Sequence, residues 1–216
     1  MRVLVFSTLS RRRLQPWVDA IQSTSVVTEV LTIGPEDWPL LSRRANGSMT
    51  HAGELLSRIR AWQADCGVAI GAPHLPPLVH SIPRMGTLAV RLGAGPDEPA
   101  GFHELWHGEE YATATVQWIG IDRRGVGAGG RIPIYRDDSI GLVRRRLEEM
   151  GCLLLASALT RVAEGGSPGV TYVTPIVTAE LPSLVRRCAL HVRVAWRRWR
   201  ARASVFLVAK TAAVLA

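Results

Sequence analysis

The sequence is poor in cysteine, which argues against a disulfide framework and against a cysteine-ligated metal site. Its three cysteines, Cys66, Cys152 and Cys188, are far apart, and no two have the spacing of a metal-binding motif. No secretory signal is recognisable ahead of them. We therefore expect buried or free thiols in a protein of the reducing cytoplasm.

Glycine is missing from the turn that follows the first predicted strand, residues 7–13. A dinucleotide-binding fingerprint would need glycines there, so NAD is not expected as a cofactor. A long apolar run is also missing. The segment 204–216 is apolar but short and interrupted by Lys210, so it is not predicted to span a bilayer.

Acidic residues are absent from Ser183 onward, whereas the same stretch holds eight cations: Arg186, Arg187, Arg193, Arg197, Arg198, Arg200, Arg202 and Lys210. The net charge of the whole chain is +8. The part before Ser183 is therefore neutral, and the basic excess lies entirely in the later part. Such a basic tail favours phosphate groups, either of lipid headgroups or of nucleic acid.

Strands and helices alternate along the first two thirds of the chain, which predicts an α/β fold. Apolar runs rich in Val and Ile predict strands at 2–7, 26–33, 66–71, 87–92, 112–121 and 131–135, and Pro133 favours an edge position for the last. Apolar residues at helical spacing predict helices at 14–21, 52–64, 78–82 and 139–164. We expect a mostly parallel sheet with flanking helices in residues 1–166.

The last of these helices is expected to be capped by Asp137 or Asp138 and bent at Gly151. Its predicted apolar face consists of Ile140, Leu142, Val143, Leu147, Leu153, Leu154, Ala158 and Leu159. The glycine-rich stretch 125–130 is predicted to be a hairpin turn. Its amide groups could cradle a phosphate, but no Gly-Lys-Ser/Thr follows, so a simple connection is favoured.

Residues 167–216 are expected to form a linker and a basic amphipathic helix at 184–203. Its apolar stripe is Leu184, Ala189, Val192, Ala195, Trp196 and Trp199, with arginines around it. Such a helix is typical of binding to an anionic membrane surface, at the inner face of the membrane for a cytoplasmic protein. It could equally pack its tryptophans onto the body. Nucleic acid is a third partner, less favoured because no base-reading module is present.

Four segments follow one another in the region 64–165: ADCGVAIGAPHLPPLVHSIPRMGTLAV, GFHELWHGEE, ATATVQWIGID and RIPIYRDDSIGLVRRRLEEMG. Their order resembles that of the folate-dependent formyltransferases, the family of methionyl-tRNA formyltransferase and sugar N-formyltransferases. The resemblance implies a Rossmann-type sheet. It also implies transfer of a formyl group from 10-formyltetrahydrofolate to an amine of a sugar nucleotide or an aminoacyl-tRNA.

The positions of the family's catalytic Asn, His and Asp fall here at Ala89, Arg91 and Val126. Ala89 has no hydrogen-bond donor in its side chain, Arg91 cannot act as a base, and Val126 has neither function. Because oxyanion donors and acid–base groups carry most of such chemistry, ordinary family catalysis is expected to be nearly lost. Ligand contacts are still expected from Arg91, Pro96, Asp97 and Asp122. Arg91 could stabilise an anion, or it could simply extend from the strand into solvent.

A competing motif, His103-Glu104-Leu105-Trp106-His107, has the pattern His-Glu-x-x-His. On a helix this spacing places both imidazoles on one side to bind zinc, with Glu104 as the base that activates a water molecule. Gly101 and Gly108 leave room for barely two helical turns, and no convincing third ligand follows, so zinc is disfavoured. The sequence thus leaves three hypotheses: a degenerate formyltransferase-like protein, a zinc hydrolase and a peripheral membrane adaptor.

Overall fold

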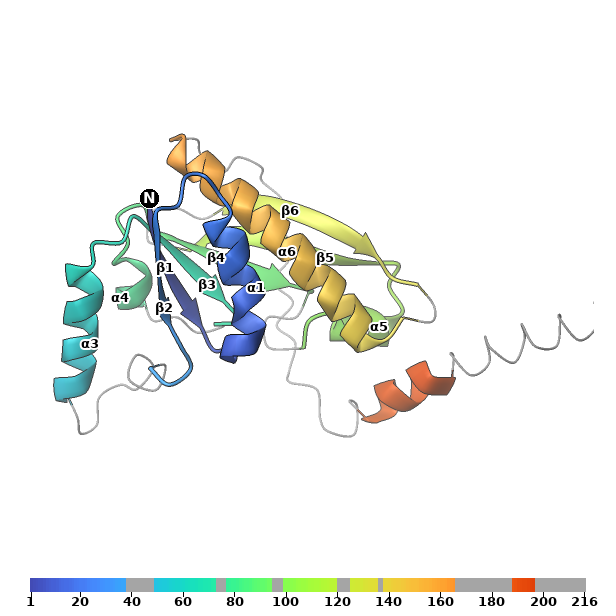
Figure 1. Cartoon of the computed structure of the whole chain (residues 1–216). Helices are drawn as coiled ribbons and strands as arrows, with labels where there is room; N and C mark the ends of the chain where they lie inside the picture. Colours follow the sequence, from blue (N-terminus) through green and yellow to red (C-terminus); the bar gives the residue numbers. More distant parts are fainter. Residues whose placement is uncertain are drawn as a thin grey trace, which may run out of the picture.

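A six-stranded sheet lies at the centre of the computed structural model, which describes residues 1–37, 49–72, 77–94, 99–119, 125–135, 138–165 and 188–196 (Figure 1). The strand order is β2-β1-β3-β4-β5-β6. The strands are β1 Arg2–Ser7, β2 Glu29–Ile33, β3 Cys66–Ile70, β4 Thr87–Leu92, β5 Tyr111–Ile119 and β6 Gly125–Pro133. The helices are α1 Arg11–Gln22, α3 Met49–Ala61, α4 Pro77–His80, α5 Phe102–His107 and α6 Ile140–Ala163.

Four strands of this sheet, β2, β1, β3 and β4, are parallel, as the alternation of strands and helices predicts. β5 then pairs antiparallel with β4, and β6 pairs antiparallel with β5. The central strand β1 is fully buried from Val3 to Phe6, because helices cover both of its faces. The predicted α/β architecture is therefore confirmed, with two antiparallel strands at one end of the sheet.

Two layers of helices enclose part of the sheet (Figure 1). α1 and α6 pack together on one face, where Trp17 and Ile21 meet Leu155 and Leu159 in the largest apolar cluster. On the other face, α3 and α4 cover the half formed by β2, β1 and β3 through Leu55, Ile59 and Val79. Beyond β3, that second face carries the partly buried side chains of Ala89 and Arg91 from β4 and of Thr113 and Gln117 from β5.

The glycine-rich stretch lies in strand β6 and is not the turn that we predicted. Gly125, Gly129 and Gly130 stand in register with β5, so the edge position is confirmed while the predicted turn is wrong. A Cβ at Gly130 would lie 2.8 Å from the sulfur of Met150 in α6. The glycine therefore allows the helix to approach the strand closely, which no turn signal can reveal.

α6 differs from its prediction at three points. It is one uninterrupted helix through Gly151, and its N-cap is Ser139, whose Oγ accepts a hydrogen bond from the Leu142 amide at 3.2 Å. Asp138 instead accepts from the Tyr135 amide and pairs with Arg146, and Asp137 lies outside the described residues. Leu153, predicted to face the core, is 70% exposed, whereas Leu155 is buried.

The basic tail is described only at 188–196, which is helical. Leu190 and Val194 are buried there against α5 and α6. Ala189, Val192, Ala195 and Trp196 of the predicted stripe are exposed, so these four residues do not form the side that packs onto the body, and Leu184 and Trp199 lie outside the described residues. The predicted boundary at residue 166 falls outside the described residues. Within the helices that are described, none is long and apolar enough to cross a membrane.

Gly151 marks the closest approach of α1 and α6, and replacing it tests that packing. A Cβ there would lie 2.5 Å from the Trp17 ring. We expect Gly151→Ala to destabilise the protein by about 1–3 kcal/mol, because overpacking outweighs the gain in helix propensity. Urea unfolding measures the change.

Gly53→Ala is the matched control, because nothing lies within 4 Å of the added methyl group in α3. It is expected to stabilise the protein by up to about 1 kcal/mol. If both variants change stability equally, the close contact with Trp17 is not what requires glycine at 151.

Candidate functional site

The carboxyl ends of the four parallel strands lie along the same side of the sheet, and open α/β sheets commonly bind ligands just beyond these strand ends. β4 ends at Leu92, and α5 follows it in the sequence before the chain returns to the sheet as β5. The side chains at the end of β4 and on the paired part of β5 therefore form the candidate site.

Strand register brings together the three positions that the resemblance assigns to the family's catalytic residues. Ala89 of β4 pairs with Gln117 of β5, and Gln117 pairs in turn with Val126 of β6. Arg91 pairs with Thr115, one step further along the same strands. Residues that are distant in the sequence thus occupy one band across three neighbouring strands.

The face that carries Arg91 is polar. Thr115 is nearly buried, Gln117 is half-buried and donates from Nε2 to the Thr115 hydroxyl at 3.4 Å, and Thr113 stands opposite Arg131 in the ladder. Arg91 is partly exposed and forms no ion pair within the described part of the chain. The guanidinium is therefore available to bind an anion or a carbonyl oxygen, but neither it nor its neighbours Ala89 and Gln117 can take a proton from an amine.

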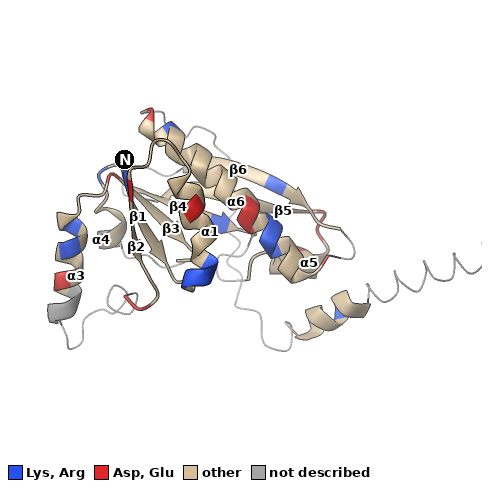
Figure 2. Ribbon diagram, viewed as in Figure 1, with Lys and Arg blue, Asp and Glu red and all other residues tan. Residues whose placement is uncertain are grey.

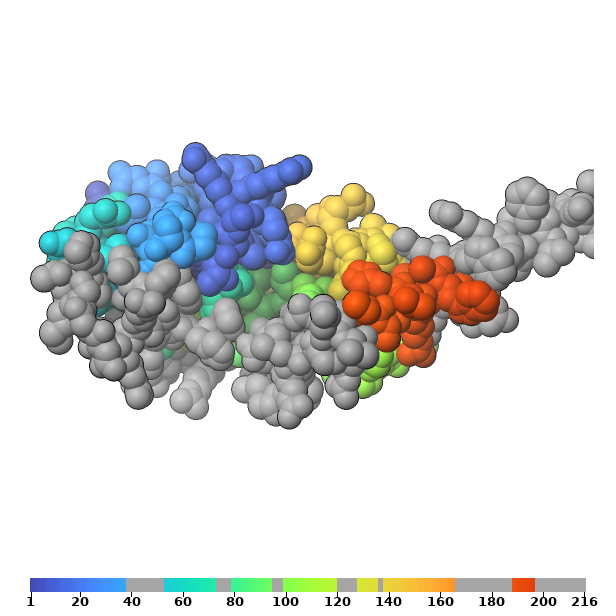
Figure 3. Space-filling model, turned by 90° about the horizontal axis from the view of Figure 1, so that it is seen from below, coloured from blue at the N-terminus to red at the C-terminus, as the bar shows by residue number. Residues whose placement is uncertain are grey.

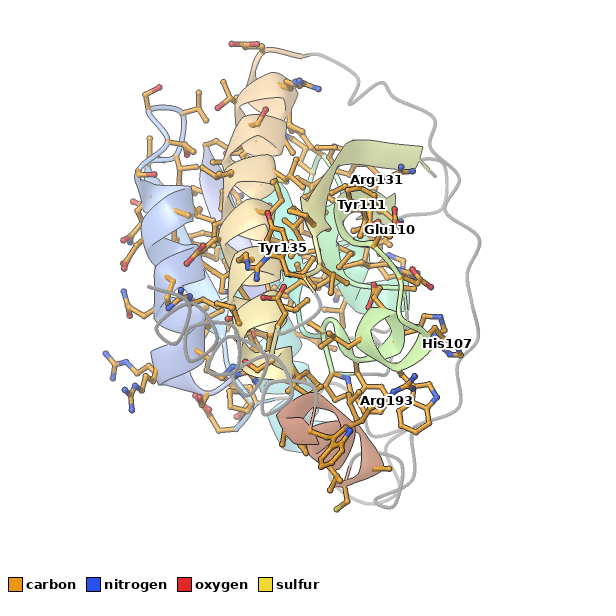
Figure 4. All side chains as sticks on the ribbon, turned by 90° about the vertical axis from the view of Figure 1, so that its right-hand side faces the viewer. His107, Glu110, Tyr111, Arg131, Tyr135 and Arg193 are labelled. Atoms are coloured by element: carbon orange, nitrogen blue, oxygen red, sulfur yellow. The ribbon has the colours of Figure 1, made fainter. Side chains whose placement is uncertain are left out.

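Further charged and aromatic residues lie at the outer edge of the same sheet. Figure 4 shows Arg131, Tyr111 and Glu110 close to one another there. Of the other predicted ligand contacts, Pro96, Asp97 and Asp122 lie outside the described residues. Only the backbone of Val126 is described, so its predicted place is known from strand register alone.

The His-Glu-x-x-His motif forms the six-residue helix α5. As its spacing predicts, the His103 and His107 rings are neighbours, with centroids 4.4 Å apart. Glu104, however, is 2% exposed, and its Oε1 accepts a hydrogen bond from the Ala94 amide at 2.8 Å. The carboxylate thus binds the loop after β4, and no cluster of three possible metal ligands occurs among the described residues.

Glu104 is the site-adjacent residue whose role the sequence did not suggest. Burial raises the pKa of its carboxyl, and the hydrogen bond from the Ala94 amide opposes that shift. Its Oε2 is buried and has no hydrogen-bond partner among the described residues. Gly93 and Gly101 have positive φ values of 88° and 79°, and a Cβ at Gly93 would lie 3.1 Å from the carboxylate. In the sequence, these two glycines are the feature that could have indicated that the loop after β4 folds closely around the Glu104 carboxylate.

Comparisons with known proteins agree with the predicted resemblance. No family model matches the chain. Methionyl-tRNA formyltransferase from Bacteroides fragilis is 23% identical over 150 residues, which cover 67% of this chain and 46% of that enzyme. The chain therefore spans about half the length of the curated relatives that it matches.

Solved structures show the same fold. Phosphoribosylglycinamide formyltransferase from Brucella melitensis superposes with a TM-score of 0.59 at 16% identity, covering 79% of this chain and 98% of that one. The formyltransferase PseJ from Anoxybacillus kamchatkensis, solved with UDP-4,6-dideoxy-4-formamido-L-AltNAc and tetrahydrofolate, superposes with a TM-score of 0.52 at 11% identity, covering 88% and 89%. The chain thus has a formyltransferase-like fold.

Titration of Glu104 is expected to make stability fall as the pH rises. Because burial raises the folded-state pKa above its ordinary value of 4.5, the folded protein holds a proton that the unfolded chain releases. Stability from this proton is complete below 4.5 and is lost as the pH passes the folded-state pKa. Glu104→Gln keeps an oxygen for the Ala94 amide without the charge, so it should gain stability relative to wild type towards neutral pH.

Urea unfolding at pH values from about 4 to about 8 measures this difference. Glu110→Gln provides the control, because it removes a carboxylate from an exposed side chain, and it is expected to change stability little. If the difference in free energy of unfolding between Glu104→Gln and wild type stays constant with pH, the buried carboxyl does not titrate in this way.

Proposed function

We propose that this chain is a formyltransferase-like binding domain. It binds a reduced folate, or the amine-bearing substrate of such a reaction, at the end of β4, and it does not transfer the formyl group by the family's route. The observation that carries the proposal is the polar band around Arg91, which lies in register with the positions that the resemblance assigns to the catalytic residues but whose described side chains offer no proton acceptor.

Binding is supported by the chemistry of this band. A formylated reduced folate carries a formyl oxygen and the carboxylates of its glutamate, and Arg91 can bind either kind of oxygen with charge-assisted hydrogen bonds. Thr115 and Gln117 supply further donors beside it. The tetrahydrofolate in the structure of PseJ, which shares this fold, makes a reduced folate the first ligand to test.

Loss of transfer follows from the same residues. Attack by an amine on a formyl carbon places negative charge on the formyl oxygen and leaves a proton on the nitrogen. Arg91 can stabilise that charge, but Ala89 cannot donate a hydrogen bond and the permanently charged guanidinium cannot accept the proton. The loss of one oxyanion donor costs roughly a hundred- to thousandfold in rate, and the loss of an acid–base group costs a similar factor.

The binding half of the proposal is tested by calorimetric titration with 5-formyltetrahydrofolate, a stable reduced folate. We expect saturable binding to the wild-type chain. Arg91→Ala should weaken it roughly ten- to hundredfold, because a hydrogen bond to a charged group is lost. Arg145→Ala removes an equal charge from an exposed side chain of α6 and should leave the affinity unchanged.

Absence of heat and of thermal stabilisation by the folate would contradict binding. Equal losses in Arg91→Ala and Arg145→Ala would contradict the role of Arg91. The second half of the proposal is tested separately with 10-formyltetrahydrofolate and amino-sugar nucleotides, and rapid enzymatic transfer in that assay would contradict it.

A further inference from the structure

The helix at 188–196 is apolar on two sides. With 100° between successive residues of an α-helix, Leu190 and Val194 share one side, while Ala189, Val192 and Trp196 share the roughly opposite side. A helix that only packed onto the body would need one apolar side. The second side therefore requires its own explanation.

The first side docks the helix onto the body. Leu190 is 1% and Val194 is 9% exposed, and both belong to the apolar cluster that contains Phe102, Leu105 and Leu147. Arg193 adds a contact at the border of this interface, donating from Nη1 to the carbonyl oxygen of Trp106 at 3.4 Å. Figure 4 shows Arg193 on the side of the helix that faces α5. The orientation of the helix is therefore fixed by α5 and α6.

The second side is left outward. Val192 is 70% and Trp196 is 57% exposed, and both are among the exposed large apolar side chains of the described residues. They are four positions apart and thus adjacent on the helix surface. Seen from below, the helix lies at the periphery of the molecule, beside α5 and α6 (Figure 3). The docking of the helix on α5 and α6 thus places Val192 and Trp196 at the periphery of the molecule.

Positive charge accompanies the pair. Arg193 is the cation on the described part of the helix, where Figure 2 shows blue on an otherwise tan ribbon. Arg197, Arg198, Arg200 and Arg202 follow in the sequence, and no acidic residue occurs from Ser183 onward. An exposed aromatic and aliphatic pair in an arginine-rich sequence is typical of helices that lie in the interface of an anionic membrane.

We propose that the outward side of the helix, formed by Ala189, Val192 and Trp196, binds the surface of an anionic lipid membrane. The headgroup–acyl boundary offers both partners that this side needs, hydrocarbon for Val192 and Trp196 and phosphate for the arginines. Nucleic acid would satisfy the arginines and stack with tryptophan, but it offers no apolar surface to Val192. This inference does not depend on ligand binding at Arg91.

Flotation of the full chain with vesicles tests the proposal. Phosphatidylcholine vesicles that contain phosphatidylglycerol should carry the chain upward, pure phosphatidylcholine should carry far less, and added salt should release it. Val192→Ser with Trp196→Ser should lower the partition coefficient about tenfold or more, because apolar area no longer enters the bilayer. Arg200→Gln with Arg202→Gln should lower it about thirtyfold, since each cation near an anionic surface contributes about 1 kcal/mol.

Two controls match these variants. Leu153→Ser removes an equally exposed apolar side chain from α6, and Arg58→Gln with Arg60→Gln removes two exposed cations from α3, across the sheet (Figure 1). Both should bind like wild type, and thermal unfolding should show that every variant is folded.

Three results would overturn the proposal. They are absence of flotation with the anionic vesicles, equal binding to pure phosphatidylcholine, and wild-type binding by the Val192 and Trp196 variant. Nucleic acid would be the partner instead if vesicles do not bind the chain but an RNA oligomer does. In that case the Arg200 and Arg202 variant should bind the RNA more weakly, and the Val192 and Trp196 variant should bind it like wild type.

Discussion

The double pairing of β4 is the constraint on which the rest of the structure depends. The strand is held in parallel by β3 and in antiparallel by β5, and its apolar residues Leu88 and Val90 are buried beneath α1 and α6. Because side chains alternate along a strand, this burial fixes Arg91 on the opposite face. A slip of one residue would bury an unpaired guanidinium at a cost of several kcal/mol, so the register has little freedom.

The proposed function separates what the fold needs from what catalysis needs. The fold needs the alternation of core-facing and outward-facing residues in β4 and β5, which Leu88 and Val90 keep on one face and Ala89 and Arg91 on the other. Under the proposal, catalysis by the family's route would need donors and acceptors on the outward face that Ala89 and Arg91 do not supply. Ala89 and Arg91 are only partly buried, so residues at these positions can change at little cost in stability. Glu104 supports the arrangement from the side by binding the first amide of the loop after β4.

Much of the fold could be predicted from the sequence because burial leaves clear patterns. The apolar run of β1, the helical spacing in α1 and the start and end of β4 are examples. The errors arose where a tertiary contact decides the outcome. Gly130 lies in a strand and leaves room for Met150, Gly151 lies within an uninterrupted helix and leaves room for Trp17, and Ser139 caps α6 while Asp138 binds Tyr135 and Arg146.

The resemblance named Ala89, Arg91 and Val126 as the positions of the family's catalytic residues, and strand register brings these positions into one band. Spacing alone could not show that the Glu104 carboxylate is buried and binds the Ala94 amide. The tail gave a related error. Its helix is apolar on two sides, so periodicity could not tell which side docks, and the contacts of Leu190 and Val194 with α5 and α6 decide it.

The central claim is that the band around Arg91 is the ligand-binding face of the sheet. Backbone amide NMR spectra recorded during titration with 5-formyltetrahydrofolate test it most directly. We expect saturable shifts at Arg91, Thr115 and Gln117, with small changes in α1 and α3. Shifts confined to other elements, or none while the protein remains folded, would contradict it.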